Sequence, residues 1–254
     1  MKLSVVIPAR NEEGCIAETV RGVFQVLERE RIPREVIVVD DGSTDSTSHC
    51  VAALDYPTIL ISNQGRHGFG MAVRAGLEKA TGDAIAVMMA DASDDPEDLV
   101  RYYRKLQEGY ECVFGSRFVR GGKVVDYPLH KLAINRLANL FIRLLFRVRS
   151  NDITNAFKCY RREVVDAMQP LISPHFNLTV EMPLKAAIRG YSYAVIPIGW
   201  TNRKTGISKL KIKEMGSRYL FIVLYLGMEK YLARGDYHRR HLELAEKKAR
   251  SQYV

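Results

Sequence analysis

The fold is decided by the stretch VIVVDDGSTDST at residues 36–47. It begins with an uninterrupted run of Val and Ile, which is typical of a strand buried on both faces. Asp40 and Asp41 follow directly, and Gly42 allows a tight turn after them. We therefore predict a buried strand at 35–39 that ends in an acidic turn.

The same pattern extends outward on both sides of this stretch. Short apolar runs that favour buried strands recur at 3–7, 58–62, 84–89 and 111–115, with helical segments between them. Asn11 is expected to cap the first helix, and Pro96 is expected to begin a later helix with Asp95 as its cap. Buried strands that alternate with helices predict an α/β fold with a doubly wound, mostly parallel sheet. In such sheets ligands bind at the carboxyl ends of the strands, where the acidic turns lie.

The rest of the chain is less regular. It contains predicted helices at 128–148 and 177–189 and predicted strands at 156–160 and 192–198. A basic loop at 201–213 precedes an apolar segment at 219–228, and the tail at 234–250 is expected to form a basic helix. An apolar run of about ten residues is half of what a bilayer span requires. The segment 219–228 is therefore expected to lie in the membrane interface, to contact a partner or to pack in the core.

Charge is distributed unevenly along the chain, whose formal net charge is +9. Residues 1–100 contain 9 Lys and Arg against 17 Asp and Glu, a net charge of −8. Residues 101–254 contain 29 against 12, a net charge of +17. Apolar clusters rather than aromatic residues accompany the basic residues, which argues against nucleic acid and favours an anionic membrane surface. A solvated basic surface is the alternative.

The cysteines are scattered through the sequence as Cys15, Cys50, Cys112 and Cys159. None of them has the paired C-x-x-C spacing of a zinc site, so a reduced cytoplasmic setting is the simplest expectation. The N-terminal stretch MKLSVVIPARNEE has too short an apolar run for a secretory signal peptide.

The acidic turns predict a binding site for a metal and a phosphorylated ligand. Asp40 and Asp41 follow one strand and Asp91 follows another. Carboxylates on short turns suit hard cations, and a divalent cation is a common way to neutralise a departing diphosphate. A single acidic turn would favour simple loop capping, but two turns at successive strand ends favour a ligand site.

Seven segments occur in order along the chain: VVIPARNEE, VIVVDDGSTDST, NQGRHGFGMAVRAG, ATGDAIAVMMADASDDPEDL, FGSRF, DITNAFKCYRREV and RKTGISKL. Together they resemble the inverting family-2 glycosyltransferases with the GT-A fold, and within that family the dolichol-phosphate mannose synthases and related polyprenyl-phosphate glycosyltransferases. The resemblance runs from about residue 3 to residue 215 and is most specific in the first 120 residues. It implies a GT-A sheet followed by amphipathic, interfacial helices.

The resemblance implies a donor site for a nucleotide-diphosphate sugar in the first half. Pro8, Arg10 and Glu12 match the stretch that borders the nucleoside. Asp40 and Asp41 match the acids that contact the base and the ribose. Arg10 stands where the family often has an aromatic residue, so base stacking is expected to differ there.

The resemblance also implies a divalent metal, Mg²⁺ or Mn²⁺. Asp91 matches the first acid of the D-x-D motif and is expected to bind both the metal and the donor. Ser93 replaces the second acid and is expected to contribute through its hydroxyl or a water. Asp95 falls where relatives can place a further metal ligand, and helix capping is its alternative role.

For the acceptor, the resemblance implies a lipid phosphate held by basic side chains. Ser116 and Arg117 match residues that face the acceptor phosphate, and Arg117 is expected to take part in catalysis. Arg203, Ser208 and Lys209 match a second phosphate-binding loop. Arg and Lys donors suit a phosphate anion.

Glu181, on the predicted helix 177–189, lies where other family-2 enzymes place a general base. A polyprenyl phosphate is already anionic near neutral pH and requires no base. Glu181 is therefore expected to act in catalysis, to orient a sugar hydroxyl or to be structural. Asp152 matches the D-x-T-S-G-F element of the family branch, in which Asn155 and Ala156 replace Ser and Gly.

These features lead to one hypothesis and two alternatives. The hypothesis is a metal-dependent, inverting transfer from GDP-mannose or a UDP-hexose to a polyprenyl or dolichyl phosphate. It is expected to occur at the cytoplasmic face of a membrane, with the protein bound peripherally or through a small membrane partner. One alternative is a soluble family-2 enzyme that acts on a non-lipid hydroxyl, and the other is a nucleotide-sugar-binding protein without catalysis.

The same hypothesis divides the chain into functional parts. Residues 1–210 are expected to form the GT-A domain, with 1–120 binding the nucleotide sugar and 121–210 the acceptor. Residues 211–254 are expected to form an apolar helix and a basic helical tail.

Overall fold

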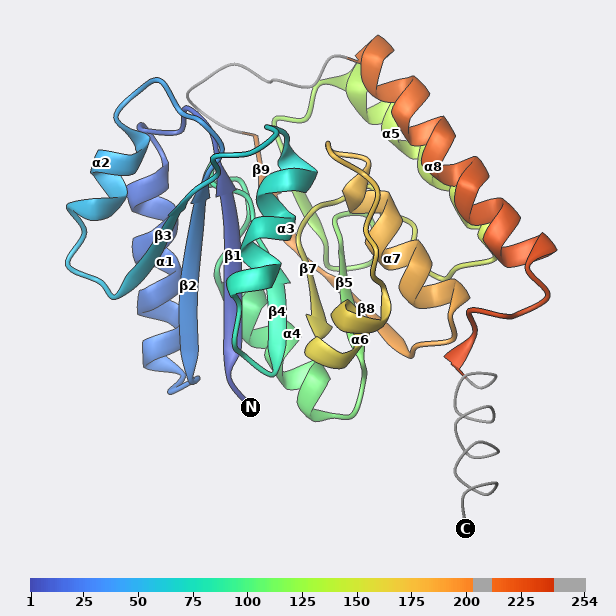
Figure 1. The fold of residues 1–254 in the computed structure, drawn as a ribbon, viewed down its shortest axis with the longest axis horizontal. Coiled ribbons are helices and arrows are strands. Elements are labelled where there is room, and N and C mark those ends of the chain that lie inside the picture. The colour runs from blue at the N-terminus through green and yellow to red at the C-terminus, as the bar shows by residue number, and fades with distance from the viewer. Residues whose placement is uncertain (203–211, 240–254) are drawn as a thin grey trace.

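A computed structural model describes residues 1–202 and 212–239 as a seven-stranded sheet covered by helices (Figure 1). The strands are β1 (Leu3–Ala9), β2 (Arg34–Asp40), β3 (Thr58–Ser62), β4 (Ala84–Val87), β5 (Cys112–Ser116), β7 (Lys158–Arg161) and β8 (Tyr193–Pro197). Their order across the sheet is β3-β2-β1-β4-β7-β5-β8, and only β7 runs antiparallel to its neighbours. The predicted α/β fold with a mostly parallel sheet is confirmed.

Helices cover both faces of the sheet because its strands are apolar on both sides. The helices packed on the sheet are α1 (Ile16–Arg29), α2 (Thr47–Ala52), α3 (Phe69–Lys79), α4 (Glu97–Gln107), α6 (Arg162–Ala167) and α7 (Leu178–Ile188). Val5 of β1 belongs to the core shared with α1 and α4, whereas Val6 belongs to the core shared with α3 and α7. Successive residues of a strand point to opposite faces, so one apolar run supplies two cores.

A second, two-stranded sheet lies beside the first at the carboxyl ends of its strands. It pairs β6 (Lys123–Val125) with β9 (Gly199–Thr201) in parallel. Trp200 of β9 also forms an antiparallel bridge with Asp94, and the Thr201 amide donates to the Ser93 carbonyl over 3.0 Å. This small sheet therefore ties the acidic turn after β4 to the segment that follows β5.

Two long helices, α5 (Leu129–Phe146) and α8 (Ile212–Leu232), lie side by side outside α7 (Figure 1). They share a third core with α7, in which Ile142 and Leu226 are buried. At their carboxyl ends, the Lys230 ammonium donates to the Phe146 carbonyl over 2.5 Å. The predicted apolar segment 219–228 thus packs partly in the core as the middle of α8.

Helices α5 and α8 carry large apolar side chains that are exposed to solvent. On α5 these are Leu129, Ile134, Leu137, Leu140, Phe141 and Leu144, and on α8 they are Leu220, Phe221, Leu224, Met228, Tyr231 and Leu232. We call these residues the apolar face. Within residues 1–202 and 212–239, no helix combines the length and the apolar character needed to cross a bilayer.

The expectation that Asn11 caps the first helix is wrong. Helix α1 begins at Ile16, and Asn11 adopts a left-handed backbone with φ of 51°. Its side-chain oxygen accepts instead from the Thr44 amide over 2.7 Å, and its own amide donates to the Ser43 hydroxyl over 2.9 Å. Asn11 therefore joins the loop after β1 to the loop after β2, a tertiary role that local capping preferences do not reveal.

Candidate functional site

A cavity of about 730 Å³ opens over the carboxyl ends of β1, β2 and β4 and extends between α5 and α8. Its polar part is lined by Pro8, Arg10, Glu12, Asp41, Asp91, Ser93, Asp94 and Arg117. Its apolar part includes Ile134, Ala138, Phe141, Ile142, Tyr219, Leu220 and Val223. The cavity therefore joins the predicted donor residues to the apolar helices in one continuous space.

Asp40 and Asp41 follow the same strand but occupy different positions. Asp41 lines the cavity, where its carboxylate accepts from the Asn63 side chain over 2.7 Å and from the Gly68 amide over 2.8 Å. Asp40 does not line the cavity, and it accepts hydrogen bonds from the Ser43 amide and the Ser48 hydroxyl. Burial alone would raise the pKa of Asp40, but the hydrogen bonds from Ser43 and Ser48 outweigh it and lower the pKa. Asp41 thus faces the cavity, and Asp40 braces the turn behind it.

The turn after β4 brings two buried carboxylates to the cavity. The hydroxyl of Ser93 donates to Asp91 over 2.5 Å, which holds the Asp91 carboxylate against its own turn. Asp94 accepts from the Met89 amide over 3.1 Å. Burial, together with the negative charge of Asp91, raises the pKa of Asp94 to about 7. Two neighbouring buried carboxylates that repel each other form a donor set that suits a hard cation.

Asp95, the second predicted metal ligand, does not line this cavity. Its side chain is exposed and accepts from the Glu97 amide over 3.0 Å at the start of α4. This is the helix-capping geometry that was the alternative role for Asp95. From the same turn, the acid that lines the cavity with Asp91 is Asp94. It precedes Asp95 directly in the acidic run, and its role was not predicted from the sequence.

Arg117 reaches the cavity from the end of β5 and is held by a buried ion pair. Its Nε and Nη2 atoms donate to the two carboxylate oxygens of Asp152 over 2.8 and 2.7 Å, and its backbone amide donates to the same carboxylate over 3.0 Å. This pairing raises the pKa of Arg117 above its usual range despite the opposing effect of burial. Arg117 therefore remains a fixed cation at the cavity wall.

Aromatic rings surround the same guanidinium. Its central carbon lies 5.2 Å from the ring centre of Phe118, 5.5 Å from that of Tyr127 and 5.7 Å from that of Trp200. Tyr127 and Trp200 also contact each other, with ring centres 5.0 Å apart, and both line the cavity. No pattern in the sequence pointed to a role for Trp200.

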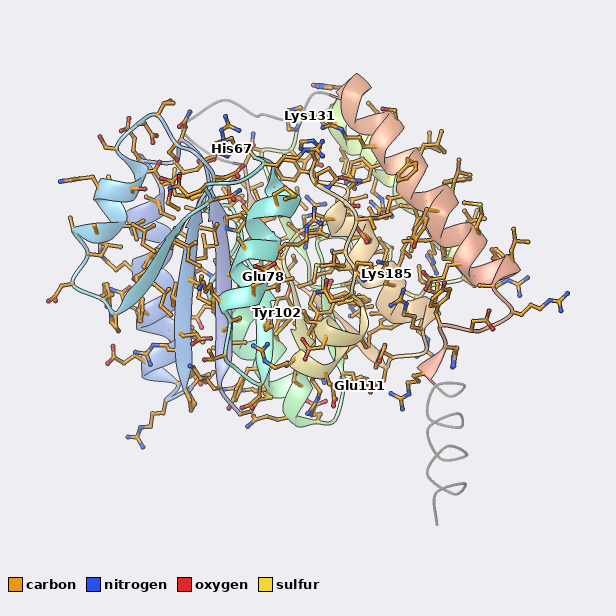
Figure 2. All side chains as sticks on the ribbon, viewed as in Figure 1. His67, Glu78, Tyr102, Glu111, Lys131 and Lys185 are labelled. Carbon is orange, nitrogen blue, oxygen red and sulfur yellow. The ribbon has the colours of Figure 1, made fainter. Side chains whose placement is uncertain are left out.

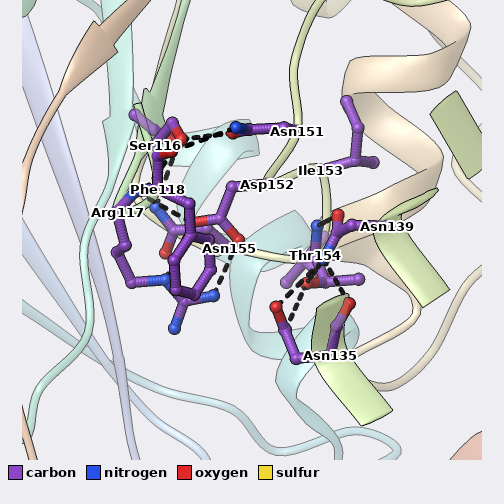
Figure 3. Close-up of polar contacts among 12 residues, drawn as sticks. Ser116, Arg117, Phe118, Asn135, Asn139, Asn151, Asp152, Ile153, Thr154 and Asn155 are labelled. Atoms are coloured by element: carbon purple, nitrogen blue, oxygen red, sulfur yellow. Dashed lines mark hydrogen bonds and ion pairs between the residues drawn. The ribbon is translucent and has the colours of Figure 1, made fainter. Parts of the chain in front are cut away.

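The loop at 151–155 connects Arg117 to helix α5 (Figure 3). The buried Asn139 of α5 donates to the Thr154 hydroxyl over 2.9 Å, and its side-chain oxygen accepts from the Thr154 amide over 3.3 Å. Asn135, one turn earlier, donates to the same hydroxyl over 2.8 Å. Two residues before Thr154, Asp152 makes the ion pair with Arg117. The position of α5 is thus linked to that of the arginine through one short loop.

Ser116 is buried and does not line the cavity. Its hydroxyl donates to the Asn151 side chain over 2.6 Å and accepts from the Phe118 amide over 3.1 Å. Beneath the same loop, the ammonium of Lys158 donates to the backbone carbonyls of Ile153 and Asn155. Burial lowers the pKa of Lys158 to about 7. Ser116 and Lys158 fix the loop that orients Arg117, and neither presents a group to the cavity.

Glu181 is fully buried within α7 and lies outside the cavity lining. It forms an ion pair of 2.8 Å with Lys185 and accepts from the amides of Ile172 and Ser173 over 2.9 and 2.8 Å. A general base must reach the proton that it abstracts. The geometry therefore argues against the expected catalytic role of Glu181 and favours the structural alternative.

Two further cations, Lys131 of α5 and Arg218 of α8, also line the cavity. In Figure 2, Lys131 and His67 lie along the same upper edge of the molecule, the edge to which the carboxyl end of β1 points. Arg203, Ser208 and Lys209, predicted to bind the acceptor phosphate, lie outside the described residues.

The sequence matches the family described as Glycosyl transferase family 2 over residues 4–168. A polyprenol monophosphomannose synthase from Mycolicibacterium smegmatis is 30% identical over 215 residues, which cover 81% of this chain and 80% of that protein. A dolichol-phosphate mannosyltransferase from Pyrococcus furiosus is 32% identical over 219 residues, which cover 84% of this chain and 60% of that protein.

Among solved structures, the chain resembles glucosyl-3-phosphoglycerate synthase from Mycobacterium tuberculosis in complex with Mn²⁺, uridine diphosphate and phosphoglyceric acid. The TM-score is 0.70 at 18% identity, and the match covers 89% of this chain and 78% of that one. A complex of the same synthase with Mg²⁺ and uridine diphosphate gives a TM-score of 0.66 at 19% identity, covering 90% of this chain and 79% of that one. At these identities the likeness establishes the fold alone.

Proposed function

The chain belongs to glycosyl transferase family 2, and on that premise we propose that it transfers a hexose from a nucleotide-diphosphate sugar to a polyprenyl phosphate, with inversion. The observation that carries the proposal is one cavity whose lining includes strand-end carboxylates, the cations Arg117 and Lys131, and an apolar wall. A donor with a diphosphate suits the first part, and an acceptor with an anionic head and an isoprenoid tail suits the second.

The donor occupies the polar part of the cavity in this proposal. Pro8, Arg10 and Glu12 border the nucleoside, and Asp41 contacts its base or ribose. GDP-mannose is the donor that the names of the two curated relatives favour, and a UDP-hexose is the second choice.

Asp91 and Asp94 suit a divalent cation, since both carboxylates are buried at the cavity and one raises the pKa of the other. When bound, Mg²⁺ or Mn²⁺ would neutralise the charge that develops on the departing diphosphate. Among the described residues, no group of three or more His, Cys, Asp or Glu side chains is placed so that it could hold a metal ion by itself. The donor phosphates and water would therefore supply the other ligands.

The acceptor phosphate binds between Arg117 and Lys131 in this proposal. An anionic phosphate oxygen attacks the anomeric carbon from the face opposite the leaving diphosphate. The phosphate oxygen carries no proton near neutral pH, so the reaction needs no general base, in agreement with the buried position of Glu181. Arg117 and Lys131 orient the nucleophile and exclude alternative positions, which is the main contribution of these side chains to the rate.

The polyprenyl tail follows the apolar part of the cavity toward the apolar face of α5 and α8. Basic side chains, among them Arg136, Arg143 and Arg147 of the α5 segment, accompany this face. Exposed apolar residues with basic neighbours suit an anionic bilayer interface. We place the protein peripherally at the cytoplasmic face of a membrane, alone or with a small membrane partner, and assign no role to nucleic acid.

A panel of donors tests the proposal. Purified protein with Mn²⁺ or Mg²⁺ and geranylgeranyl phosphate is given GDP-mannose, UDP-glucose or UDP-N-acetylglucosamine, and the released nucleotide and the glycolipid are measured. We expect one donor to yield a glycosyl phosphate lipid. Transfer to geranylgeraniol or to a free sugar hydroxyl, without transfer to the lipid phosphate, would overturn the assignment of the acceptor.

The hydroxyl-acceptor alternative depends on Glu181 as the base. Glu181→Gln abolishes turnover if that alternative holds, whereas our proposal expects activity per folded molecule to stay within about threefold. The matching Lys185→Met variant disturbs the same buried ion pair from its other side and serves as the structural control. Loss of activity in Glu181→Gln alone would favour the base.

A further inference from the structure

Trp200 joins the donor and acceptor sides of the cavity. Its backbone pairs with Val124 of β6 and forms the bridge to Asp94, while its ring lines the cavity. The next residue, Thr201, donates its amide to the Ser93 carbonyl over 3.0 Å. The backbone on which the ring is mounted is therefore fixed to the turn that carries Asp91 and Asp94.

The ring of Trp200 reaches the guanidinium of Arg117, 5.7 Å from its central carbon, and Tyr127 lies 5.5 Å from the same atom. Attraction between a guanidinium and an aromatic face acts within about 6 Å and strengthens when the pair is removed from water. Arg117 is buried, so both contacts are within this distance and are largely removed from water.

Asp152 by itself does not prevent the guanidinium from rotating about the edge that it binds. A carboxylate that accepts from Nε and Nη2 fixes one edge of the planar group. Within the described ranges 1–202 and 212–239, Nη1 has no hydrogen-bond partner, and it is the donor left to meet a ligand. Rings packed around the group limit its rotation about the Asp152 edge and so fix the direction in which Nη1 points.

We propose that Trp200, assisted by Tyr127, is a positioning residue that aims the free edge of Arg117 at the acceptor phosphate. Because the backbone of Trp200 is bridged to Asp94, it also sets the spacing between the acidic turn and the arginine. This inference rests on the proposed function, since it takes Arg117 to bind the acceptor phosphate. Trp200 acts through Arg117 and makes no contact of its own with the donor.

The chain contains a single tryptophan, so its fluorescence reports on this position without any substitution. Geranyl phosphate is the probe, and geraniol, which has the same chain without the phosphate, is its control. We expect geranyl phosphate to shift the emission and geraniol to leave it unchanged. An equal response to both compounds would mean that the ring contacts the isoprenoid chain, and no response to either would mean that it does not sense the arginine. Each of these results overturns the proposal.

Steady-state kinetics provide the second measurement. Trp200→Leu removes the aromatic face, and we expect the KM for geranylgeranyl phosphate to rise about tenfold. The KM for the nucleotide sugar and its slow hydrolysis without acceptor should remain within about twofold. Trp200→Phe keeps an aromatic face and should recover most of the loss. An unchanged acceptor KM, or an equal rise in the donor KM, contradicts the positioning role.

Tyr237→Leu is the matched control. The Tyr237 ring lies 5.5 Å from the guanidinium of Arg189, so this variant removes an aromatic–arginine contact away from the cavity. Its acceptor KM should equal that of the wild type. If the wild-type protein transfers no sugar to the lipid phosphate, the proposed function fails. If it does and Trp200→Leu matches the wild type, only the present inference fails.

Discussion

The proposed donor and acceptor sides of the cavity fix their functional groups in different ways. On the donor side, each carboxylate at the turn after β4 is held by an atom a few residues away, as Asp91 is by Ser93 and Asp94 by the Met89 amide. On the acceptor side, Arg117 is held by Asp152 and by Trp200, which lie far along the chain. At the turn after β4 the two carboxylates accept hydrogen bonds from within the turn, whereas Arg117 is held by partners that reach it only after the chain has assembled.

This difference has consequences for substitution. A change at Asp91 or Asp94 should alter mainly that carboxylate, because each accepts a hydrogen bond from within the same turn. A substitution on the acceptor side should also affect more distant groups, since the loop at 151–155 links Arg117 to α5 and hence to the apolar face. The predictions below test the two sides separately, beginning with the largest effect.

The largest effect is expected at the acidic turn. Asp91→Asn removes a buried charge that faces the donor diphosphate, and we expect kcat/KM for transfer to fall by about 10³-fold. Asp95→Asn, four residues away and exposed, should change it less than about threefold. Donor turnover and the affinity for Mn²⁺ are measured for both variants. Equal losses in the two would mean that Asp95 binds the metal and that the capping geometry is not its main role.

Arg117→Lys tests the acceptor side. Lys keeps the charge but cannot make the two-atom contact with Asp152 or stack against the rings, so acceptor kcat/KM should fall by about 10²-fold. Donor hydrolysis without acceptor should persist. Arg120→Lys, at an exposed position in the neighbouring turn, is the control. A parallel loss of donor hydrolysis in Arg117→Lys would show that the two sides are not separable.

The apolar face should control membrane binding rather than folding. Leu137 and Leu144 are each 70% exposed, and changing both to Ser should reduce binding to anionic lipid vesicles by at least about tenfold. Thermal stability should be unchanged. Vesicle sedimentation measures the effect, and Ile59→Ser on the exposed edge strand β3 is the control. Unchanged sedimentation of the double variant would contradict the membrane assignment of this face.

The smallest effect is expected at Glu35, which braces the donor half beneath the site. Burial raises its pKa, but hydrogen bonds from Lys2, Ser4 and Thr81 outweigh burial and lower the pKa from 4.5 to about 2. An acid whose pKa is lower in the folded state than in the unfolded state stabilises the fold at pH values above the unfolded pKa. This stabilisation is lost as the pH falls through the folded pKa. Glu35→Gln should therefore lower the free energy of unfolding on the order of 2 kcal/mol at pH 7.

The pH dependence of that difference is itself a test. The gap between Glu35→Gln and the wild type should close as the pH falls from about 4.5 toward about 2. Denaturant unfolding across this range measures it. Glu97→Gln, which breaks the exposed ion pair with Arg29, should have little effect on stability at any pH. A gap that stays constant with pH would mean that Glu35 stabilises by packing alone.

Much of the donor half could be predicted from the sequence. The apolar runs located the first five strands along the chain, since both faces of a parallel sheet are covered and a continuous apolar run satisfies both. The acidic turns followed from those strands, and Asp41 and Asp91 do line the cavity. The errors were local, as with Asn11, whose side chain found a tertiary partner in Thr44 in place of a helix end.

The choice among neighbouring acids could not be made from the sequence. Asp40 and Asp41 are adjacent, as are Asp94 and Asp95, and in each pair the structure turns only one carboxylate into the cavity. Which one turns inward depends on dihedral angles of the turn and on distant partners such as Asn63 and Trp200. Neither the turn dihedral angles nor the distant partners can be inferred from residue type and spacing.

The sequence by itself determined the sheet, its acidic strand ends and the family to which the chain belongs, because these depend on apolar runs and on motifs short enough to be read locally. Only the tertiary structure decided that Glu181 is buried against Lys185, that Asp94 shares the cavity with Asp91, and that Trp200 meets Arg117. The contact between Trp200 and Arg117 joins segments far apart in the chain. The Glu181–Lys185 and Asp91–Asp94 pairs are local in sequence, but whether they are buried or face the cavity is set by how the two cores and the outer helices pack together.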